Sequence, residues 1–538
     1  MSKDNNFLKG AAILSIAGII VKILGAIYRI PLSNIIKPEG MGYYQTAYPF
    51  YQLLLTLSTS GFPVAIAKLV SEKRALGDYR SAYKVFKVAF VGLLIGGILS
   101  SLFILIGAEA IVESVGNKNA YYSLIALVPA LFFVPIMSSF RGFFQGRKTM
   151  VPTATSQIAE QLIRVAVGLS LTTLLLDKGL PIAAGGASFG GSAGAIAGFA
   201  VIIFIYFKNR HSIKEEVRLC TVDKQYNTST IVKDLLAISI PITIGSAIVP
   251  IMDTIDTALV FQRLQSIGYS AKLANDLYGQ LKGMAQTLIN LPMVFSVAIA
   301  MSMVPAISDA YIRKNKGEIK DIISSGIRIT LLIGLPAALG LFVLARPLIN
   351  LLYYNNTAQD IDSIGRILSV LSFGVIFLTL VQTLTAMLQG LGKTFVPVKN
   401  LAIGAVFKIV LTYILTGIPS INILGAAFST VVTYAVASLL DLYSIVRITK
   451  LKLDYKTIVL KPLISSVGMA IMARLGYVVS ASVVGDRLST LGGVLAGVIT
   501  YVILLVVTGT LTKEDFAMLP RGEKIGSKLE RFKYKKKK

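Results

Sequence analysis

Runs of hydrophobic residues, broken by short polar segments, follow one another along nearly the whole chain. A helix that crosses a bilayer needs ~20 mostly apolar residues, and by that measure the pattern predicts about fourteen spanning helices. Many runs contain Gly or Pro, which membrane helices tolerate better than soluble helices do. The runs are centred near Ile23, Leu57, Ile95, Pro129, Val165, Ala197, Val249, Leu291, Leu332, Ile376, Lys408, Ala435, Met469 and Ile499. The pattern therefore predicts an all-α polytopic membrane protein without additional soluble domains.

The composition strengthens this interpretation and excludes several classes of site. Hydrophobic residues make up 54% of the 538 residues and charged residues 15%, whereas soluble proteins carry about 25% charged residues. The chain has one histidine, His211, and one cysteine, Cys220. This excludes a zinc site, a disulfide framework and a Cys–His catalytic pair, so no cofactor is expected. The sequence also lacks the phosphate-binding loop of ATP-driven transporters.

Basic residues outnumber acidic ones by 53 to 27, a formal net charge of +26. In a soluble protein this excess would suggest nucleic acid, but here the cations gather in short loops that follow even-numbered spans. These loops are Lys68–Lys87, Arg141–Lys148, Lys208–Lys233, Arg313–Lys320, Lys393–Lys399 and Arg447–Lys452. Basic loops face the cytoplasm, so we expect a multi-pass protein of the cell membrane with both termini inside and no nucleic-acid partner.

The chain contains an internal repeat. The segment Gln145–Pro152, QGRKTMVP, recurs with one inserted residue as Gln389–Pro397, QGLGKTFVP. Val70-Ser71-Glu72 and Ile307-Ser308-Asp309 end the second span of each half. Parallel repeats of this kind are a transporter architecture with the substrate site between the halves. The predicted organisation is an N-terminal six-helix lobe at 1–223, a C-terminal six-helix lobe at 224–452, two additional helices at 453–512 and a basic cytoplasmic tail at 513–538.

Three further stretches carry a family resemblance: Lys22–Arg29 (KILGAIYR), Gly61–Glu72 (GFPVAIAKLVSE) and Met303–Ser308 (MVPAIS). With the repeat, they resemble the multidrug/oligosaccharidyl-lipid/polysaccharide exporter superfamily, in the branch of stage V sporulation protein B and the MurJ-like lipid II flippases. The resemblance implies two pseudo-symmetric lobes around a V-shaped central cavity, as in MATE transporters. It also implies that an undecaprenyl-diphosphate-linked saccharide is flipped from the inner to the outer leaflet.

The first span departs from the pattern of the Gram-negative flippases, Arg-x-Leu-Gly-x-x-Arg-Asp. Lys22 takes the position of the first arginine, Tyr28 that of the second, and Arg29 stands where the acid would be. The cations of those relatives are therefore not carried over. The saccharide stays open between lipid II and a related polysaccharide precursor.

Ionisable residues inside predicted spans are the candidates for binding, because each costs at least ~2.5–3.5 kcal/mol to insert. Lys22 and Arg29 lie two helical turns apart on one face. Glu160 and Arg164 are spaced i,i+4 and face one another. The candidate substrate-binding residues of the cavity are Lys22, Arg29, Glu160, Arg164, Lys282 and Lys408. The alternative for each is a structural role, either as a paired charge or as a side chain that extends to the membrane surface.

Asp253 and Asp256 are spaced i,i+3 in the seventh span. Two neighbouring carboxylates could bind Na⁺ or share a proton, and these residues are the ion-coupling candidates. The alternative is that they pair with Arg29. Tyrosines near the ends of the spans are expected to form the aromatic belt at the outer interface: Tyr43, Tyr44, Tyr48, Tyr51, Tyr121 and Tyr122.

These observations favour a flippase without a catalytic step, working by alternating access. Membrane potential alone supplies ~2.3 kcal/mol per charge per 100 mV, so either the potential or an ion gradient could drive it. The alternative is a cation-coupled exporter of drugs or metabolites. The expected partners are the polyprenyl-diphosphate-linked saccharide, membrane lipids and the cell-wall synthesis machinery. An enzyme is not expected, because no long loop carries paired acids.

Overall fold

The computed structural model describes residues 2–220, 226–450 and 454–510, and these residues form helices and turns without any β-strand. Contacts divide the chain into two compact units. Unit 1 is Met1–Met284 with Thr416–Ser420, and unit 2 is Ala285–Leu415 with Ile421–Lys538. Each unit is described by itself below. The predicted all-α fold class is confirmed.

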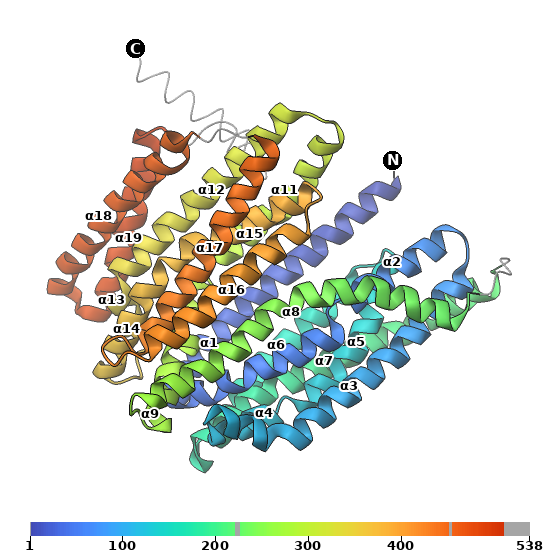
Figure 1. Cartoon of the computed structure of the whole chain (residues 1–538), viewed down its shortest axis with the longest axis horizontal. Coiled ribbons are helices and arrows are strands. Elements are labelled where there is room, and N and C mark those ends of the chain that lie inside the picture. The colour runs from blue at the N-terminus through green and yellow to red at the C-terminus, as the bar shows by residue number, and fades with distance from the viewer. Residues whose placement is uncertain (1, 221–225, 451–453, 511–538) are drawn as a thin grey trace. The chain divides into compact units, whose positions relative to one another are not determined.

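Unit 1 begins with a long helix that changes direction at Lys37, where the backbone leaves helical geometry with φ 57°. The helices labelled in Figure 1 follow in chain order: α1 (Ser2–Thr59), α2 (Phe62–Ala75), α3 (Tyr79–Val115), α4 (Tyr121–Ile125), α5 (Val128–Gly146), α6 (Val151–Leu174), α7 (Leu180–Arg218), α8 (Thr228–Ser266) and α9 (Ala271–Tyr278). A π-helical turn, Gly279–Ala285, comes directly after α9.

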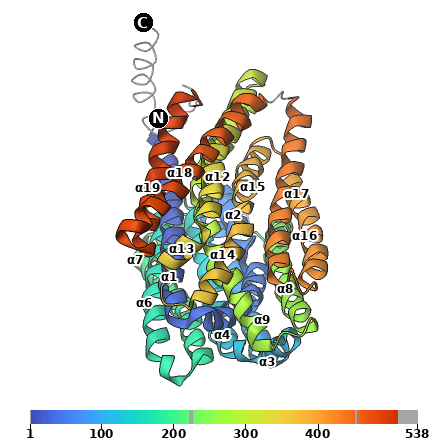
Figure 2. The same cartoon turned by 90° about the vertical axis from the view of Figure 1, so that its left-hand side faces the viewer.

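Unit 2 holds the remaining helices, and its last two form a hairpin whose first member packs against α12 (Figure 2). The helices are α10 (Gln286–Ile289), α11 (Met293–Ile312), α12 (Lys316–Val343), α13 (Ala345–Leu352), α14 (Ala358–Ser372), α15 (Gly374–Gly390), α16 (Phe395–Thr416), α17 (Ile423–Thr449), α18 (Lys461–Val484) and α19 (Asp486–Val507). A second π-helical turn, Lys456–Leu460, precedes α18.

Among the described residues, eleven helices are long and apolar enough to cross a membrane, or twelve if the bent pair Ala358–Gly390 is one span. The sequence predicted about fourteen. One difference arises because α1 and α2 are counted as a single stretch although α1 bends at Lys37. The other is α6, whose charged residues Glu160 and Arg164 lower its hydropathy. The eighth predicted span, centred near Leu291, is interrupted between α10 and α11.

The repeated hairpins have the same backbone geometry. The Lys148 amide donates to the Gln145 carbonyl at 2.8 Å, and the Gly392 amide donates to the Gln389 carbonyl at 2.9 Å. Lys148 and Gly392 both adopt the left-handed conformation, with φ 62° and φ 75°, that ends many helices. The repeat thus preserves the turn itself, and the inserted residue falls at the start of the helix that follows.

The glycine before each turn makes the same helix contact in both halves. A Cβ added to Gly146 would lie 2.7 Å from the Val70 Cβ, and one added to Gly390 would lie 2.9 Å from the Ile307 Cβ. Val70 and Ile307 belong to the other repeated motif. The two repeated segments are therefore contact partners, because only glycine lets α5 approach α2, and α15 approach α11, this closely.

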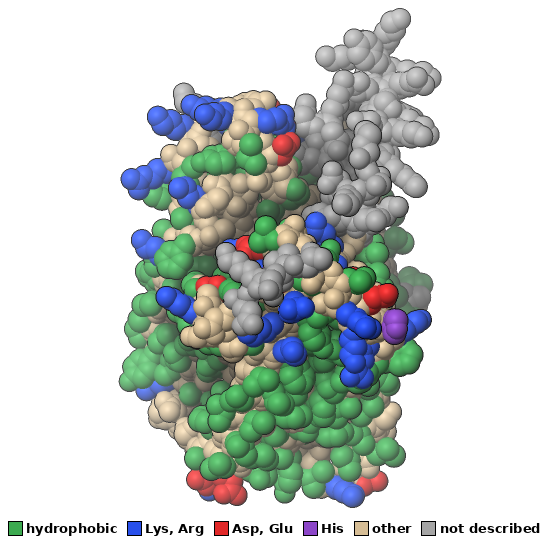
Figure 3. Space-filling view, turned by 90° about the vertical axis from the view of Figure 1, so that its right-hand side faces the viewer, with side chains coloured by type: hydrophobic (Ala, Val, Ile, Leu, Met, Phe, Trp, Pro, Cys, Tyr) green, Lys and Arg blue, Asp and Glu red, His purple; other side chains and the backbone are tan. Residues whose placement is uncertain are grey.

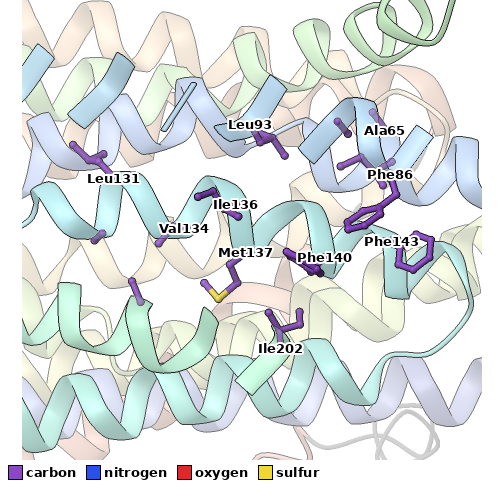
Figure 4. Packing of buried hydrophobic residues seen from close by; sticks show 14 of the residues in the cluster. Ala65, Phe86, Leu93, Leu131, Val134, Ile136, Met137, Phe140, Phe143 and Ile202 are labelled. Carbon is purple, nitrogen blue, oxygen red and sulfur yellow. The ribbon is translucent and has the colours of Figure 1, made fainter. Parts of the chain in front are cut away.

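The core of unit 1, where α3, α5 and α7 meet, combines aliphatic side chains with a group of packed aromatic rings (Figure 4). The ring of Phe86 lies 4.6 Å from that of Phe143 and 5.1 Å from that of Phe140. The opposite face of α3 exposes apolar side chains, including Leu99, Phe103 and Ile106. Figure 3 shows a continuous hydrophobic surface below His211 and its basic neighbours, as expected for a surface that meets lipid.

The compact units do not coincide with the halves expected from the repeat. Helix α8, which starts the second half at Thr228, packs against α1, α2 and α3 and so belongs to unit 1. Unit 1 therefore extends to Met284. The lobe boundaries at 223 and 452 rest on the sequence repeat and stay a prediction.

The glycine contacts make a prediction about stability. Gly146→Ala and Gly390→Ala force a Cβ against a neighbouring helix, and overpacking of this kind costs about 1–3 kcal/mol. Each variant should unfold at a temperature several degrees lower in detergent. Gly92→Ala is the matched control, because nothing lies within 4 Å of its added Cβ and alanine favours a helix by about 0.5–1 kcal/mol. Equal or higher Tm for Gly146→Ala would contradict the proposed contact.

Candidate functional site

Two arginines and one glutamate from α5 and α6 form a network of two ion pairs inside unit 1. Arg164 Nη2 donates to Glu160 Oε1 at 3.0 Å, and Arg141 Nη2 donates to Glu160 Oε2 at 3.0 Å. Arg141 Nε also donates to Ser156 Oγ at 3.0 Å. The predicted Glu160–Arg164 pair is confirmed as a contact. Because two guanidinium groups share one carboxylate, the group keeps one positive charge.

Arg141 was missed as a site residue, since it appeared to belong to the basic loop that ends at Lys148. It lies in α5 about one turn before that helix ends, and only the packing of α5 beside α6 brings it to Glu160. Another donor of Arg164, its Nε, is buried and has no hydrogen-bond partner among the described residues. The guanidinium group of Arg164 can therefore still donate a hydrogen bond to a further acceptor.

Three tyrosines of α1 lie near these charges. The ring of Tyr48 is 6.2 Å from that of Tyr44 and 5.8 Å from that of Tyr51, so the three form a continuous row. All three lie within electrostatic range of Arg164. Arg29 is similarly near Tyr44. We call Arg29, Arg141, Glu160, Arg164 and these three tyrosines the arginine–tyrosine cluster.

The expected aromatic belt is wrong for part of its members. Tyr43, Tyr44 and Tyr51 are buried within the protein, and Tyr122 is exposed. The bend at Lys37 is the reason, because it turns the second part of α1 into the interior of unit 1. A tyrosine near the end of a predicted span is therefore not necessarily in contact with lipid.

The first part of α1 runs along α6. Gly168 of α6 leaves room for the hydroxyl of Tyr28, which donates to the carbonyl of Ala187 on α7 at 3.1 Å. Tyr28 thus joins three helices. Arg29 is half-buried, whereas the Lys22 side chain is exposed and makes no ion pair in the part of the chain that the structure describes. Of the two cations predicted on this face, Arg29 lies within electrostatic range of Tyr28 and Tyr44.

A second charged group joins α8 to the π-helical turn. Lys282 Nζ lies 3.1 Å from Asp256 Oδ2 and 3.2 Å from Asp253 Oδ1. Lys282 and Asp256 are buried, and Asp253 keeps 34% of its side chain exposed. We call these residues the lysine–aspartate triad. With two carboxylates and one ammonium group, it carries one negative charge.

Sequence reasoning had offered Arg29 as the alternative partner of the two aspartates, and the structure shows that Lys282 contacts both of them. Lys282 sits in a π-helical turn, a local distortion that often marks functional sites. The turn is held against α1, because Gln45 Nε2 donates to the Lys282 carbonyl at 3.0 Å. Gly279 and Gly42 face each other at the same contact.

In unit 2, α16 carries Lys408, which is 2% exposed and among the largest fully buried side chains. The same unit holds an acid that sequence reasoning missed. Asp441 of α17 is buried and accepts a hydrogen bond from Asn400 Nδ2 at 2.8 Å. A single acid inside the apolar run Ile423–Thr449 was the signal that could have identified it.

Comparisons with known proteins agree with this architecture. The family model described as polysaccharide biosynthesis protein matches residues 7–311, and the MatE model matches residues 282–414. The uncharacterized membrane protein YabM of Bacillus subtilis is 32% identical, over 97% of this chain and 96% of its own. Stage V sporulation protein B of the same organism is 30% identical, over 96% and 98%. Lipid II flippase MurJ of that organism is 29% identical, over 94% of each chain.

Solved structures share the fold. Lipid II flippase MurJ in an inward closed conformation superposes with a TM-score of 0.68 at 18% identity, over 92% of this chain and 98% of its own. An inward-facing multidrug resistance MATE family transporter gives 0.66 at 15% identity, over 80% and 95%. The chain therefore belongs to the polysaccharide biosynthesis protein family, within the multidrug/oligosaccharidyl-lipid/polysaccharide exporter superfamily.

Proposed function

We propose that this protein is a flippase that moves an undecaprenyl-diphosphate-linked saccharide from the inner to the outer leaflet by alternating access. The observation that carries the proposal is the net positive charge of the arginine–tyrosine cluster within membrane-spanning helices. A diphosphate is the anionic part of such a substrate. The relatives named as stage V sporulation protein B and lipid II flippase MurJ support a lipid-linked saccharide, with lipid II as one candidate.

The cluster suits a diphosphate for two reasons. Attraction between opposite charges is stronger in a low dielectric than in water. The planar guanidinium group also offers paired donors that match phosphate oxygens, and Arg164 Nε is a buried donor still without an acceptor among the described residues. The tyrosine hydroxyls add donors and acceptors for phosphate or sugar oxygens. Together these groups would hold the headgroup while its lipid chain stays in the bilayer.

Membrane potential favours export of this headgroup. A diphosphate carries about two negative charges, so moving it out of a negative interior releases roughly 4–5 kcal/mol at 100 mV. An ion could add to this through the lysine–aspartate triad. Na⁺ or a proton bound by Asp253 or Asp256 would compete with Lys282, because the triad has one more acid than base. Coupling would then act through the π-helical turn that carries Lys282.

A second candidate is a cation-coupled exporter of drugs or metabolites. The excess negative charge of the triad and the MatE match over residues 282–414 favour it. The arginine–tyrosine cluster counts against it, since a positive cluster repels cationic drugs. In either case we propose a cell-membrane location with both termini in the cytoplasm. Cell-wall synthesis enzymes would be the partners that consume a flipped precursor.

Cysteine labelling tests the orientation. In a Cys220→Ser background, Lys118→Cys and Asn355→Cys should react with a membrane-impermeant maleimide in intact cells, because both positions are exposed at loops that follow odd-numbered spans. Lys316→Cys and Arg210→Cys lie near basic loops and should react only after the cells are opened. The opposite labelling pattern would reverse the topology.

Removal of the cluster's charged pair tests the flippase itself. In proteoliposomes, the variant Glu160→Gln with Arg164→Gln should translocate a fluorescent polyprenyl-diphosphate-linked saccharide at least tenfold more slowly, because a charge-assisted hydrogen bond to phosphate is lost. Arg164→Lys should keep part of the rate, since the charge remains without the fork. Arg313→Gln, which removes a cation from an exposed ion pair, is the control and should be unaffected. Unchanged rates in the double variant would assign the charges a structural role.

A neutral version of the triad tests ion coupling. The variant Asp253→Asn, Asp256→Asn and Lys282→Met removes all three charges together, so it should fold, whereas Lys282→Met alone removes the ammonium group that both acids contact and should lose several kcal/mol of stability. If the triad couples transport, the neutral variant should translocate at one rate with or without a Na⁺ or pH gradient. Asp441→Asn is the matched control in unit 2. Loss of gradient dependence in Asp441→Asn alone would place coupling there instead.

A further inference from the structure

Unit 2 contains a cavity of about 530 Å³ where the ends of α12 and α13 meet α14 and α18. Its wall includes three arginines, Arg346, Arg366 and Arg474, and one acid, Asp362. Arg346 Nε donates to a carboxylate oxygen of Asp362. Arg366 and Arg474 have no acidic partner among the described residues. Among the residues that line the cavity, three arginines thus face one acid, and Asp486 of α19 lies within electrostatic range of Arg346, so the site keeps a net positive charge.

The position of the cavity makes this charge unusual. Helix α12 starts in the basic segment Arg313–Lys320 and reaches the cavity at its other end, so the cavity lies on the opposite side of the membrane from that loop. Arg474 is ten residues from the end of α18, about 15 Å along the helix axis. Its neighbours Leu475 and Val478 are exposed apolar residues. Arg474 is exposed on the same surface, where a ligand can reach it, and a cation on a lipid-facing surface is costly without a counter-charge.

The residues that line the cavity indicate which kind of anionic ligand would bind there. Arginines bind phosphate through paired hydrogen bonds, and basic pockets between spanning helices bind the headgroups of anionic lipids. The guanidinium of Arg474 lies 5.5 Å from the ring of Tyr477, a contact that restrains its direction at the cavity wall. The exposed apolar ring of Phe342 also borders the cavity. A phosphate joined to a hydrocarbon chain satisfies both the arginines and this apolar rim.

We infer that this cavity binds the phosphate of an anionic lipid in the outer leaflet, with the lipid chain along the exposed face of α18. Arg366 and Arg474 are the residues that hold the phosphate. The outer leaflet follows from the position opposite the basic loop. The cavity belongs to unit 2 alone and shares no residue with the arginine–tyrosine cluster or the lysine–aspartate triad. The site therefore does not depend on the proposed transport activity, and only its assignment to the outer leaflet rests on the proposed orientation.

Native mass spectrometry of the full chain in detergent tests this site. The probes are phosphatidylglycerol, undecaprenyl phosphate, zwitterionic phosphatidylcholine and inorganic phosphate. We expect one anionic lipid to remain tightly bound. Each of the substitutions Arg366→Gln and Arg474→Gln should weaken its binding about tenfold, because each removes a charge-assisted hydrogen bond, and the double variant combines both losses. Arg487→Gln is the control, since this exposed arginine of α19 lies at the same end of unit 2, bonds the Tyr354 carbonyl and does not line the cavity.

The outcomes separate the sources of the phosphate. Stronger retention of phosphatidylglycerol or of undecaprenyl phosphate identifies the lipid class, and either result supports the site if the double variant loses it. Competition by inorganic phosphate as effective as that by lipid would overturn a lipid site. Equal weakening by Arg487→Gln would show a non-specific charge effect and overturn it as well. If the double variant does not fold, Arg474→Gln alone, which breaks no ion pair among the described residues, must still bind about tenfold more weakly.

Discussion

The low dielectric of the membrane governs this protein, because a charge buried in a spanning helix is costly without an opposite charge nearby. In this protein, two charges of one sign contact a single charge of the opposite sign, so the buried charges do not form simple one-to-one pairs. Two arginines share Glu160, and two aspartates share Lys282. Sharing leaves one positive charge in the first group and one negative charge in the second. In the function proposed above, those residual charges are the ones that would attract a ligand.

Both groups are fixed to the same element, the second part of α1. The bend at Lys37 directs this segment inward, so its tyrosines approach Arg164 while Gln45 bonds the turn that carries Lys282. Glycines make the contacts close enough, as Gly42 faces Gly279. A displacement of this part of α1 would therefore change both charged groups together. If the triad binds an ion and the cluster binds the substrate, as proposed, this shared segment would couple the two binding events.

Local patterns predicted what depends on local geometry. The all-α class and the contact between Glu160 and Arg164 follow from hydropathy and from the helical period, and the structure confirms both, although it gives eleven or twelve candidate spans among the described residues where about fourteen were predicted. Contacts between helices were not predictable in the same way. Arg141 reaches Glu160, and Lys282 reaches the two aspartates, only because particular helices pack side by side. The burial of Tyr44 and Tyr51 depends on one backbone distortion at Lys37, which hydropathy does not register.

The signs of the residual charges bear on the choice between the two functions. A positive cluster attracts a diphosphate and repels a cationic drug, whereas a negative triad attracts Na⁺ or a proton. A drug exporter of cationic substrates would need only the negative group, and the arginines of α5 and α6 would then oppose its substrate. An anionic substrate moved together with, or against, a cation needs both signs in one unit, and unit 1 supplies both. The charge pattern thus favours the flippase on the same physical ground that makes buried charge costly.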